Sequence, residues 1–173
     1  MSYGIRPSAT QNTAALWAKS LLNAVLFFAV FMVALPLLAR RLLPVALPLP
    51  GPLAGVAGAV LCIGGLAVWA VCLDHFSRRG RGTPFPLDAP QELVTSGPFG
   101  VIRNPIMAGE LAVIWGEALL FNQLGIAVYA LLVTVLGHVA ITRIEEPELG
   151  ERFGATYAAY SSRVPRWFPA LRP

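Results

Sequence analysis

The sequence predicts an all-α integral membrane protein, with four transmembrane helices and a cytoplasmic C-terminal helical segment that encloses a polar pocket. Hydrophobic residues make up 56% of the 173 residues, charged residues only 13%, and the mean hydropathy is +0.65. A soluble domain usually carries about 25% charged residues. Four apolar runs each approach the roughly 20 residues that a helix needs to cross a bilayer. The length suits one domain, so we expect residues 1–173 to form a single membrane domain.

The first two apolar runs carry no charge. Residues 21–39 are interrupted only by Asn23 and Pro36, and residues 52–73 follow after a proline-containing connection. The first run starts too far along the chain for a signal peptide, and two arginines follow it instead of a cleavage site. Glycines in and beside the second run predict a small-residue face for close helix packing or for a homodimer. They are Gly51, Gly55, Gly58, Gly64 and Gly65.

The last two apolar runs predict an antiparallel helical hairpin. Residues 105–121 begin with a proline, which suits the first turn of a helix, and residues 124–142 follow after a tight turn at Asn122 and Gln123. Pro147 donates no backbone hydrogen bond and disfavours helical geometry in the residue before it. We therefore expect the last run to kink or end there, and a new helix to begin at Pro147.

The basic residues orient these four runs. Of the 13 basic residues, only Arg40 and Arg41 lie between the first two runs, and the rest lie on the opposite side. By the positive-inside rule, we expect both termini to be cytoplasmic. Arginine far outnumbers lysine, and alanine, glycine and proline are abundant, which suggests a bacterial inner-membrane protein. No basic patch alternates with aromatic residues on a polar face, so we expect no nucleic-acid partner. The scattered histidines and cysteines predict no metal site.

The connection over residues 74–100 is rich in proline and glycine. Loops longer than about 12–15 residues without regular structure are usually functional or disordered. Interleaved apolar residues would hold this one against the membrane face: Phe76, Phe85, Leu87, Leu93 and Val94. We therefore expect a compact, functional loop.

Acidic residues in the last two runs indicate the polar pocket. Glu110 and Glu117 are seven residues apart and share one helical face. An ionisable group at membrane depth is costly unless it is paired or lines a cavity, so it marks a functional site by default. The alternative for both acids is an interhelical hydrogen bond to a threonine or histidine.

Helical spacing also groups the polar residues of the fourth run. A helix would place His138, Thr142, Glu145 and Leu149 on one face,. Glu145 and Glu146 would then lie at the cytoplasmic mouth of the bundle. The alternative is that they are simply solvated acids at a membrane boundary.

Two patterns carry a family resemblance. The first is Leu93-Val94-Thr95-Ser96-Gly97-Pro98-Phe99, followed by Arg103-Asn104-Pro105. The second runs from Glu145-Glu146 and Leu149 through Phe153-Gly154, Tyr157 and Tyr160 to Arg163-Val164-Pro165-Arg166. In their order and spacing they resemble the isoprenylcysteine carboxyl methyltransferase and phospholipid methyltransferase superfamily, over roughly residues 83–169.

The resemblance implies an integral-membrane methyltransferase that binds S-adenosylmethionine without a Rossmann domain. Its cofactor pocket would lie between the last spans and the cytoplasmic C-terminal segment. The implied cofactor-binding residues are Leu93, Val94, Gly97, Arg103, Asn104, Pro105, Met107, His138, Glu145, Glu146 and Leu149. Asn104 stands where many members have histidine, and Met107 where a tyrosine is common.

Glu110 and Arg163 are the candidate catalytic residues. Methyl transfer is an in-line displacement, for which an enzyme aligns the acceptor and excludes water. An amine or thiol acceptor must first lose a proton, which Glu110 or His138 could accept, whereas a carboxylate or thiolate needs no base. Arg163 falls in the family pattern and could face the acceptor. Arg166, Trp167 and Phe168 are interpreted as an interfacial anchor.

We expect the acceptor to be lipophilic or small and membrane-partitioning, reached from the cytoplasmic side. Candidates are the carboxylate of a prenylated cysteine, a lipid amine and a thiol. Two other functions stay open from the sequence: an NADPH-dependent membrane reductase of similar C-terminal architecture, and a non-catalytic scaffold whose acids only hold helices together.

Overall fold

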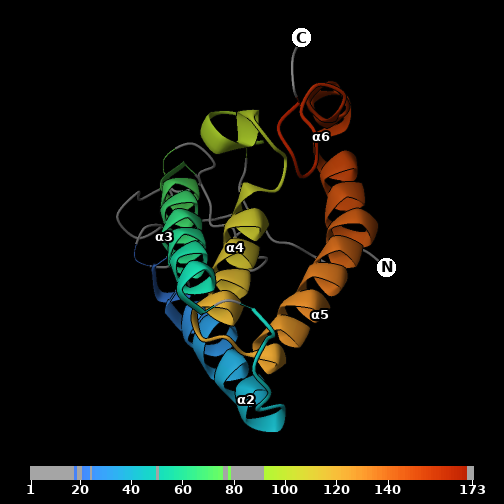
Figure 1. Ribbon diagram of the computed structural model, residues 1–173. Coiled ribbons are helices and arrows are strands. Elements are labelled where there is room, and N and C mark those ends of the chain that lie inside the picture. Colours follow the sequence, from blue (N-terminus) through green and yellow to red (C-terminus); the bar gives the residue numbers. More distant parts are fainter. Residues whose placement is uncertain are drawn as a thin grey trace.

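The computed structural model describes residue 18 and residues 21–23, 25–49, 51–75, 78 and 92–170. These residues form helices and no strands (Figure 1). In chain order the helices are the π-helix η1 (Phe28–Ala34), α2 (Leu35–Leu42), α3 (Gly51–His75), the 3-10 turn η4 (Gly97–Gly100), α4 (Pro105–Leu120), α5 (Leu124–Ala140), the π-helix η5 (Ile141–Glu145) and α6 (Glu146–Ser161).

Three helical stretches among the described residues are long and apolar enough to cross a membrane. They are Leu21–Leu42, Gly51–His75 and the stretch that begins at Leu124. They contain the first, second and fourth predicted spans. The third, α4, has only 16 residues, which is about 24 Å of helix against a hydrocarbon core of about 30 Å. The all-helical membrane architecture is thus confirmed, while a fourth complete crossing stays a prediction.

Glycines bring α3 and α4 into backbone contact. A Cβ placed on Gly65 would lie 2.5 Å from the carbonyl oxygen of Gly109, and one on Gly58 would lie 2.6 Å from the carbonyl oxygen of Gly116. The two contacts are seven residues apart on each helix, so both lie on the same face of α3 and on the same face of α4. The predicted small-residue packing is therefore confirmed for Gly58 and Gly65. The other glycines of the predicted face, Gly51, Gly55 and Gly64, have no atom within 4 Å of such a Cβ.

The end of the bundle opposite the C-terminal segment is held by contacts between α5 and the η1–α2 segment. Gly125 of α5 lies against the backbone carbonyls of Ala39 and Leu43 in and after α2. The Tyr129 hydroxyl donates a hydrogen bond of 2.9 Å to the carbonyl oxygen of Phe31 in η1. A π-helix disturbs the usual hydrogen-bond ladder, and Tyr129 supplies this carbonyl with a donor. The tight turn predicted between the last two runs is confirmed: Asn122 has a φ of +50°.

A helical stretch of 38 residues joins α5, η5 and α6. The part before the kink at Gly154 has about 30 residues, which at 1.5 Å per residue is about 45 Å and exceeds a bilayer core of about 30 Å. The apolar α5 can cross the membrane, and α6, which begins at Glu146, then lies beyond it. The kink or end predicted at Pro147 was wrong: Glu146 has helical angles of φ −64° and ψ −42°, and the helix continues through it. The non-helical residue is Gly154, with φ +50° and ψ −124°.

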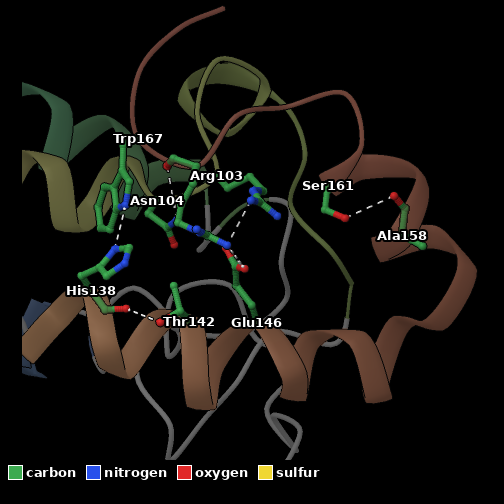
Figure 2. Close-up of polar contacts among 9 residues, drawn as sticks. Arg103, Asn104, His138, Thr142, Glu146, Ala158, Ser161 and Trp167 are labelled. Carbon is green, nitrogen blue, oxygen red and sulfur yellow. Dashed lines mark hydrogen bonds and ion pairs between the residues drawn. The ribbon is translucent and has the colours of Figure 1, made fainter.

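The π-helix η5 changes the register predicted for the polar face. The backbone N–H of Glu146 donates to the carbonyl of Ile141, five residues earlier, so the chain needs one more residue to complete this turn. Figure 2 shows His138, Thr142 and Glu146 on one side of the helix, whereas the sequence predicts Glu145 at that place. The predicted face was therefore wrong in its register, because regular α spacing does not hold through a π-turn.

Candidate functional site

Polar side chains meet where α4 begins and where α5 gives way to α6. Glu146 forms two hydrogen bonds of 2.8 Å with Arg166, from Nε to Oε1 and from Nη2 to Oε2. Nη2 of Arg103 lies 3.5 Å from Oε1 of the same carboxylate. One acid thus joins two arginines that are 63 residues apart in sequence (Figure 2). The paired geometry of Arg166 is the strongest kind of arginine–carboxylate contact.

Residues 165–167, here called the C-terminal strap, cross this region. The Arg103 N–H donates to the Pro165 carbonyl at 2.8 Å, and the Asn104 side-chain amide donates to the Arg166 carbonyl at 3.3 Å. On the other side, Nε1 of Trp167 donates to Nδ1 of His138 at 3.1 Å. The strap therefore bridges the start of α4 and the end of α5, which diverge toward this end in Figure 1.

The contact between Glu146 and Arg166 shifts the pKa of both side chains. The hydrogen bond from Arg166 lowers the pKa of Glu146 below its ordinary value of 4.5, against the effect of partial burial, and the nearby Arg103 charge adds to the lowering. The same contact raises the pKa of Arg166. A carboxyl group whose pKa is lowered in the folded state stabilises that state at pH values above the ordinary carboxyl pKa. This stabilisation is lost as the pH falls through the pKa of the folded state. Glu146 is therefore ionised at neutral pH.

Two tyrosines of α6 tie the site to the preceding loop. The Tyr160 hydroxyl donates to the Phe99 carbonyl at 2.7 Å, and burial raises its pKa to about 12, so the hydroxyl keeps its proton. Tyr157 is buried and forms a side-chain hydrogen bond with Arg103. These contacts bring the second half of the resemblance pattern against the first half.

The loop before α4 packs on the end of α3. Val94 is buried in a cluster with Cys72 and Phe99, and Leu93 is half-buried; the expected docking of these residues against the membrane face stays a prediction. Phe76, Phe85 and Leu87 lie outside the described residues. Gly97 has a φ of +61°, and a Cβ there would collide with the ring of His75.

Substituting Gly97 with alanine is expected to destabilise the protein by about 2 kcal/mol. A left-handed conformation costs a non-glycine residue about 1–2 kcal/mol, and the His75 ring must also move. Thermal unfolding in detergent measures the loss. The double variant Gly97→Ala/His75→Ala should recover the stability lost through the collision with the His75 ring, but not the stability lost through the left-handed backbone. Equal stability of Gly97→Ala and wild type would contradict this explanation.

The other implied cofactor-binding residues surround the strap without all touching it. Pro105 is fully buried in the first turn of α4. Met107 contacts Gly137, where α5 has no side chain in its way. Leu149 is half-buried on α6, and the Glu145 side chain is exposed. The structure thus gathers Arg103, Asn104, His138 and Glu146 around residues 165–167, and places Met107, Glu145 and Leu149 on the flanking helices.

The two acids of α4 do not belong to the Arg103–Glu146–Arg166 set, although Glu110 lies close enough to Glu145 for their charges to interact. Trp69 of α3 donates a hydrogen bond to Glu110, which also lines a cavity of about 10 Å³ with Phe28, Met32 and Leu66. Such a volume holds about one water molecule. Oε2 of Glu117 is buried and has no hydrogen-bond partner among the described residues. For Glu110 the predicted interhelical hydrogen bond exists, but its partner is a tryptophan rather than a threonine or histidine.

Two residues of the site have contacts that the sequence did not predict. Arg166 and Trp167, interpreted as part of an interfacial anchor, donate hydrogen bonds to Glu146 and His138. Phe168 has 82% of its surface exposed, and the interfacial anchor stays a prediction. Arg163, the predicted catalytic arginine, is exposed, and its Nε donates to the Ala159 carbonyl of its own helix. The arginine that reaches the site is three residues further along, after the turn at Pro165.

No group of three histidine, cysteine, aspartate or glutamate side chains that could hold a metal ion occurs within the part of the chain that the structure describes. The charged groups at the site are the Arg103–Glu146–Arg166 set. It combines two cations and one anion with the hydrogen-bonding groups of Asn104, His138 and Trp167. Such a set can hold a polar ligand that carries charges of both signs.

Comparison with known proteins points to one family. Residues 53–156 match the model of a family described as phospholipid methyltransferase, which is more than half of the chain. The chain is 35% identical over 72 residues to a phosphatidylethanolamine N-methyltransferase of Yarrowia lipolytica, covering 42% of this chain and 8% of that protein. It is also 33% identical over 79 residues to the cobalt-zinc-cadmium resistance protein CzcN of Cupriavidus metallidurans, covering 46% of this chain and 36% of that protein. The chain thus matches only a minor part of the length of these relatives.

Proposed function

Because the chain belongs to the phospholipid methyltransferase family, we propose that it transfers a methyl group from S-adenosylmethionine to a lipophilic or small membrane-partitioning acceptor. The reaction takes place at the cytoplasmic face of the membrane. The family supports methyl transfer, and the polar set at the end of α5 is the observation that supports this cofactor.

The polar set suits a large zwitterion. Nε of Arg103 is buried and has no hydrogen-bond partner among the described residues, so it is free to donate to a carboxylate. S-adenosylmethionine carries a carboxylate, an ammonium group and ribose hydroxyls, and it supplies a methyl group on a sulfonium that is a good leaving group. Glu146 is paired with this arginine, and Glu145 precedes Glu146 in the sequence. Leu93, Val94, Gly97, Asn104, Pro105, Met107, His138 and Leu149 would frame the rest of the ligand, as the resemblance implies.

The two glutamates would serve different purposes. Both oxygens of Glu146 are engaged by Arg166, so its main role would be to position the strap and Arg103. Glu145 is exposed and carries no comparable ion pair among the described residues, so its carboxylate is available to accept hydrogen bonds from ribose hydroxyls or the ammonium group. Glu145 would therefore contact the cofactor directly, whereas Glu146 would hold the strap and Arg103 in position.

The acceptor would lie on the membrane side of these residues. A lipid amine, a thiol or the carboxylate of a prenylated cysteine would each suit an active site that faces the bilayer. An amine or thiol needs a base, for which Glu110 is the buried candidate, with His138 the alternative nearer the strap. Arg163 would contact the acceptor only from the exposed side of α6.

The distribution of arginines supports one orientation of the helices in the membrane. We propose that α4 completes a four-span bundle with both termini in the cytoplasm, in a bacterial inner membrane. The 16 residues of α4 would need local thinning of the bilayer, or polar flanks that reach its surface. A homodimer would have to use the outward glycines of α3.

Binding of the demethylated product, S-adenosylhomocysteine, is the direct test. Calorimetry in nanodiscs should detect micromolar-range binding, weakened about tenfold or more by Glu145→Ala and by Glu146→Ala. Glu151→Ala is the matched control, because Glu151 is an exposed acid of α6 that contacts none of these groups. The absence of binding to wild-type protein would rule out the proposal.

A dinucleotide reductase is the second candidate function. Such an enzyme needs arginines for phosphate groups, and here Arg103 and Arg166 are already paired with Glu146. This pairing disfavours a polyanionic cofactor. Competition between NADPH and the product of the methyl donor would separate the two functions. A pure scaffold would bind neither, and Glu145→Gln and Glu146→Gln would then change only its stability.

A further inference from the structure

The C-terminal strap covers residues that the cofactor would have to reach. Four of the implied cofactor-binding residues make contacts with residues 165–167: Arg103 by its backbone, and Asn104, His138 and Glu146 by their side chains. Nδ1 of His138 and both carboxylate oxygens of Glu146 are engaged by strap donors. A large ligand in this region must therefore lie under the strap or replace its contacts.

The attachment of the strap is asymmetric. At its N-terminal side the chain is joined to α6, where the Val164 N–H donates to the Tyr160 carbonyl at 3.0 Å and the Arg163 N–H donates to the same carbonyl at 3.1 Å. On the other side Phe168 is 82% exposed, and no hydrogen bond is made by residues 168–170 within the described structure. Within the described residues, the strap is therefore held by backbone hydrogen bonds on its N-terminal side and by none on its C-terminal side.

The contacts that close the strap are few and mostly made by side chains. One backbone hydrogen bond, from Arg103 to Pro165, joins it to α4. The side chain of Arg166 keeps 33% of its surface exposed while Glu146 keeps 14%. Segments with few buried contacts and solvent-accessible hydrogen bonds open at a small fraction of the cost of global unfolding. Opening of this strap therefore needs no change in the helical bundle.

We propose that residues 165–167 form a hinged flap that opens to admit the cofactor and closes over it, with Arg166 and Trp167 as its positioning residues. This inference rests on the proposed function, because it assigns the flap to the same site. Arg166 holds the flap through Glu146, and Trp167 holds it through His138. Closure excludes water from the site, as methyl transfer requires, and slows the escape of the bound ligand.

The test is the rate at which S-adenosylhomocysteine leaves the full-length protein in nanodiscs. Arg166→Gln should speed dissociation about tenfold or more without slowing association. Arg166→Lys should fall between it and wild type, because a lysine cannot form the two-bond contact. Trp167→Phe, which keeps the ring and loses the hydrogen bond to His138, should speed dissociation by a few-fold. Phe168→Ala is the matched control on the exposed side and should leave the rate unchanged.

Hydrogen exchange gives a readout that needs no ligand. The Arg103 amide donates to Pro165, so its protection reports a closed flap, and Arg166→Gln should reduce that protection while Phe168→Ala should not. If Arg166→Gln reduces the protection of the Arg103 amide but leaves the dissociation rate of S-adenosylhomocysteine unchanged, the flap proposal would be overturned, even if binding itself is normal. Wild-type protein that binds no product would instead overturn the proposed function.

Discussion

Replacing Gly65 with leucine is expected to lower the free energy of unfolding in detergent by about 3 kcal/mol or more. A Cβ at this position would lie 2.5 Å from the Gly109 carbonyl oxygen and 2.9 Å from Cγ2 of Val113. Overpacking of a well-packed interior costs about 1–3 kcal/mol, and sometimes more. The obstacle here is backbone, which cannot rotate away as a side chain can. The two helices would therefore have to separate along their shared face.

Gly64 provides the control for this substitution. It is the neighbouring residue of the same helix, and a Cβ there has nothing within 4 Å. Gly64→Leu should leave the unfolding midpoint close to that of wild type, as judged by thermal or denaturant unfolding of both variants in one detergent. Equal losses for the two variants would show that close packing of α3 on α4 does not hold the bundle together.

Replacing Glu146 with alanine is expected to destabilise the end of the bundle around the C-terminal strap by about 2 kcal/mol. Removing one partner of a buried ion pair costs about 3–5 kcal/mol, because it leaves a buried charge without compensation. The smaller figure applies because Arg166 is one-third exposed and water screens part of its charge. The loss should appear in unfolding followed at the C-terminal segment, and as faster hydrogen exchange of the Arg103 amide.

A double-mutant cycle separates this pair from its surroundings. Arg166→Ala alone should cost less than Glu146→Ala, because Arg103 still compensates the acid at 3.5 Å. The double variant should cost clearly less than the sum of the two, since contacting residues couple by about 0.5–3 kcal/mol. Strict additivity would mean that the Arg166–Glu146 contact contributes nothing to stability in solution.

The local patterns of the sequence account for most of the fold. Uncharged runs of sufficient length predict the helices, Pro105 marks the first turn of α4, and Asn122 marks the turn before α5. These features depend on neighbouring residues and on burial in lipid, which composition reflects directly. The family pattern likewise lies in short segments whose residues can be matched one by one.

The errors arise where distant parts of the chain set the geometry. Spacing alone put Glu145 on the face of His138, because an α-helix is the default and a π-turn leaves no local signal. Composition alone does not show which groups Arg166 and Trp167 contact. Their contacts depend on a partner 20 residues away, Glu146, and on one 29 residues away, His138.

The sequence by itself therefore determined the membrane class, the helical segments, the family and the set of polar residues from which a site could be built. Only the tertiary structure decided which of those residues meet. It brought Glu146 and Arg166 together, and it placed Gly58 and Gly65, rather than the neighbouring glycines, against α4. The physical reason is that hydrophobicity and turn preferences act along the chain, whereas ion pairing and close packing depend on which faces the folded helices turn toward each other.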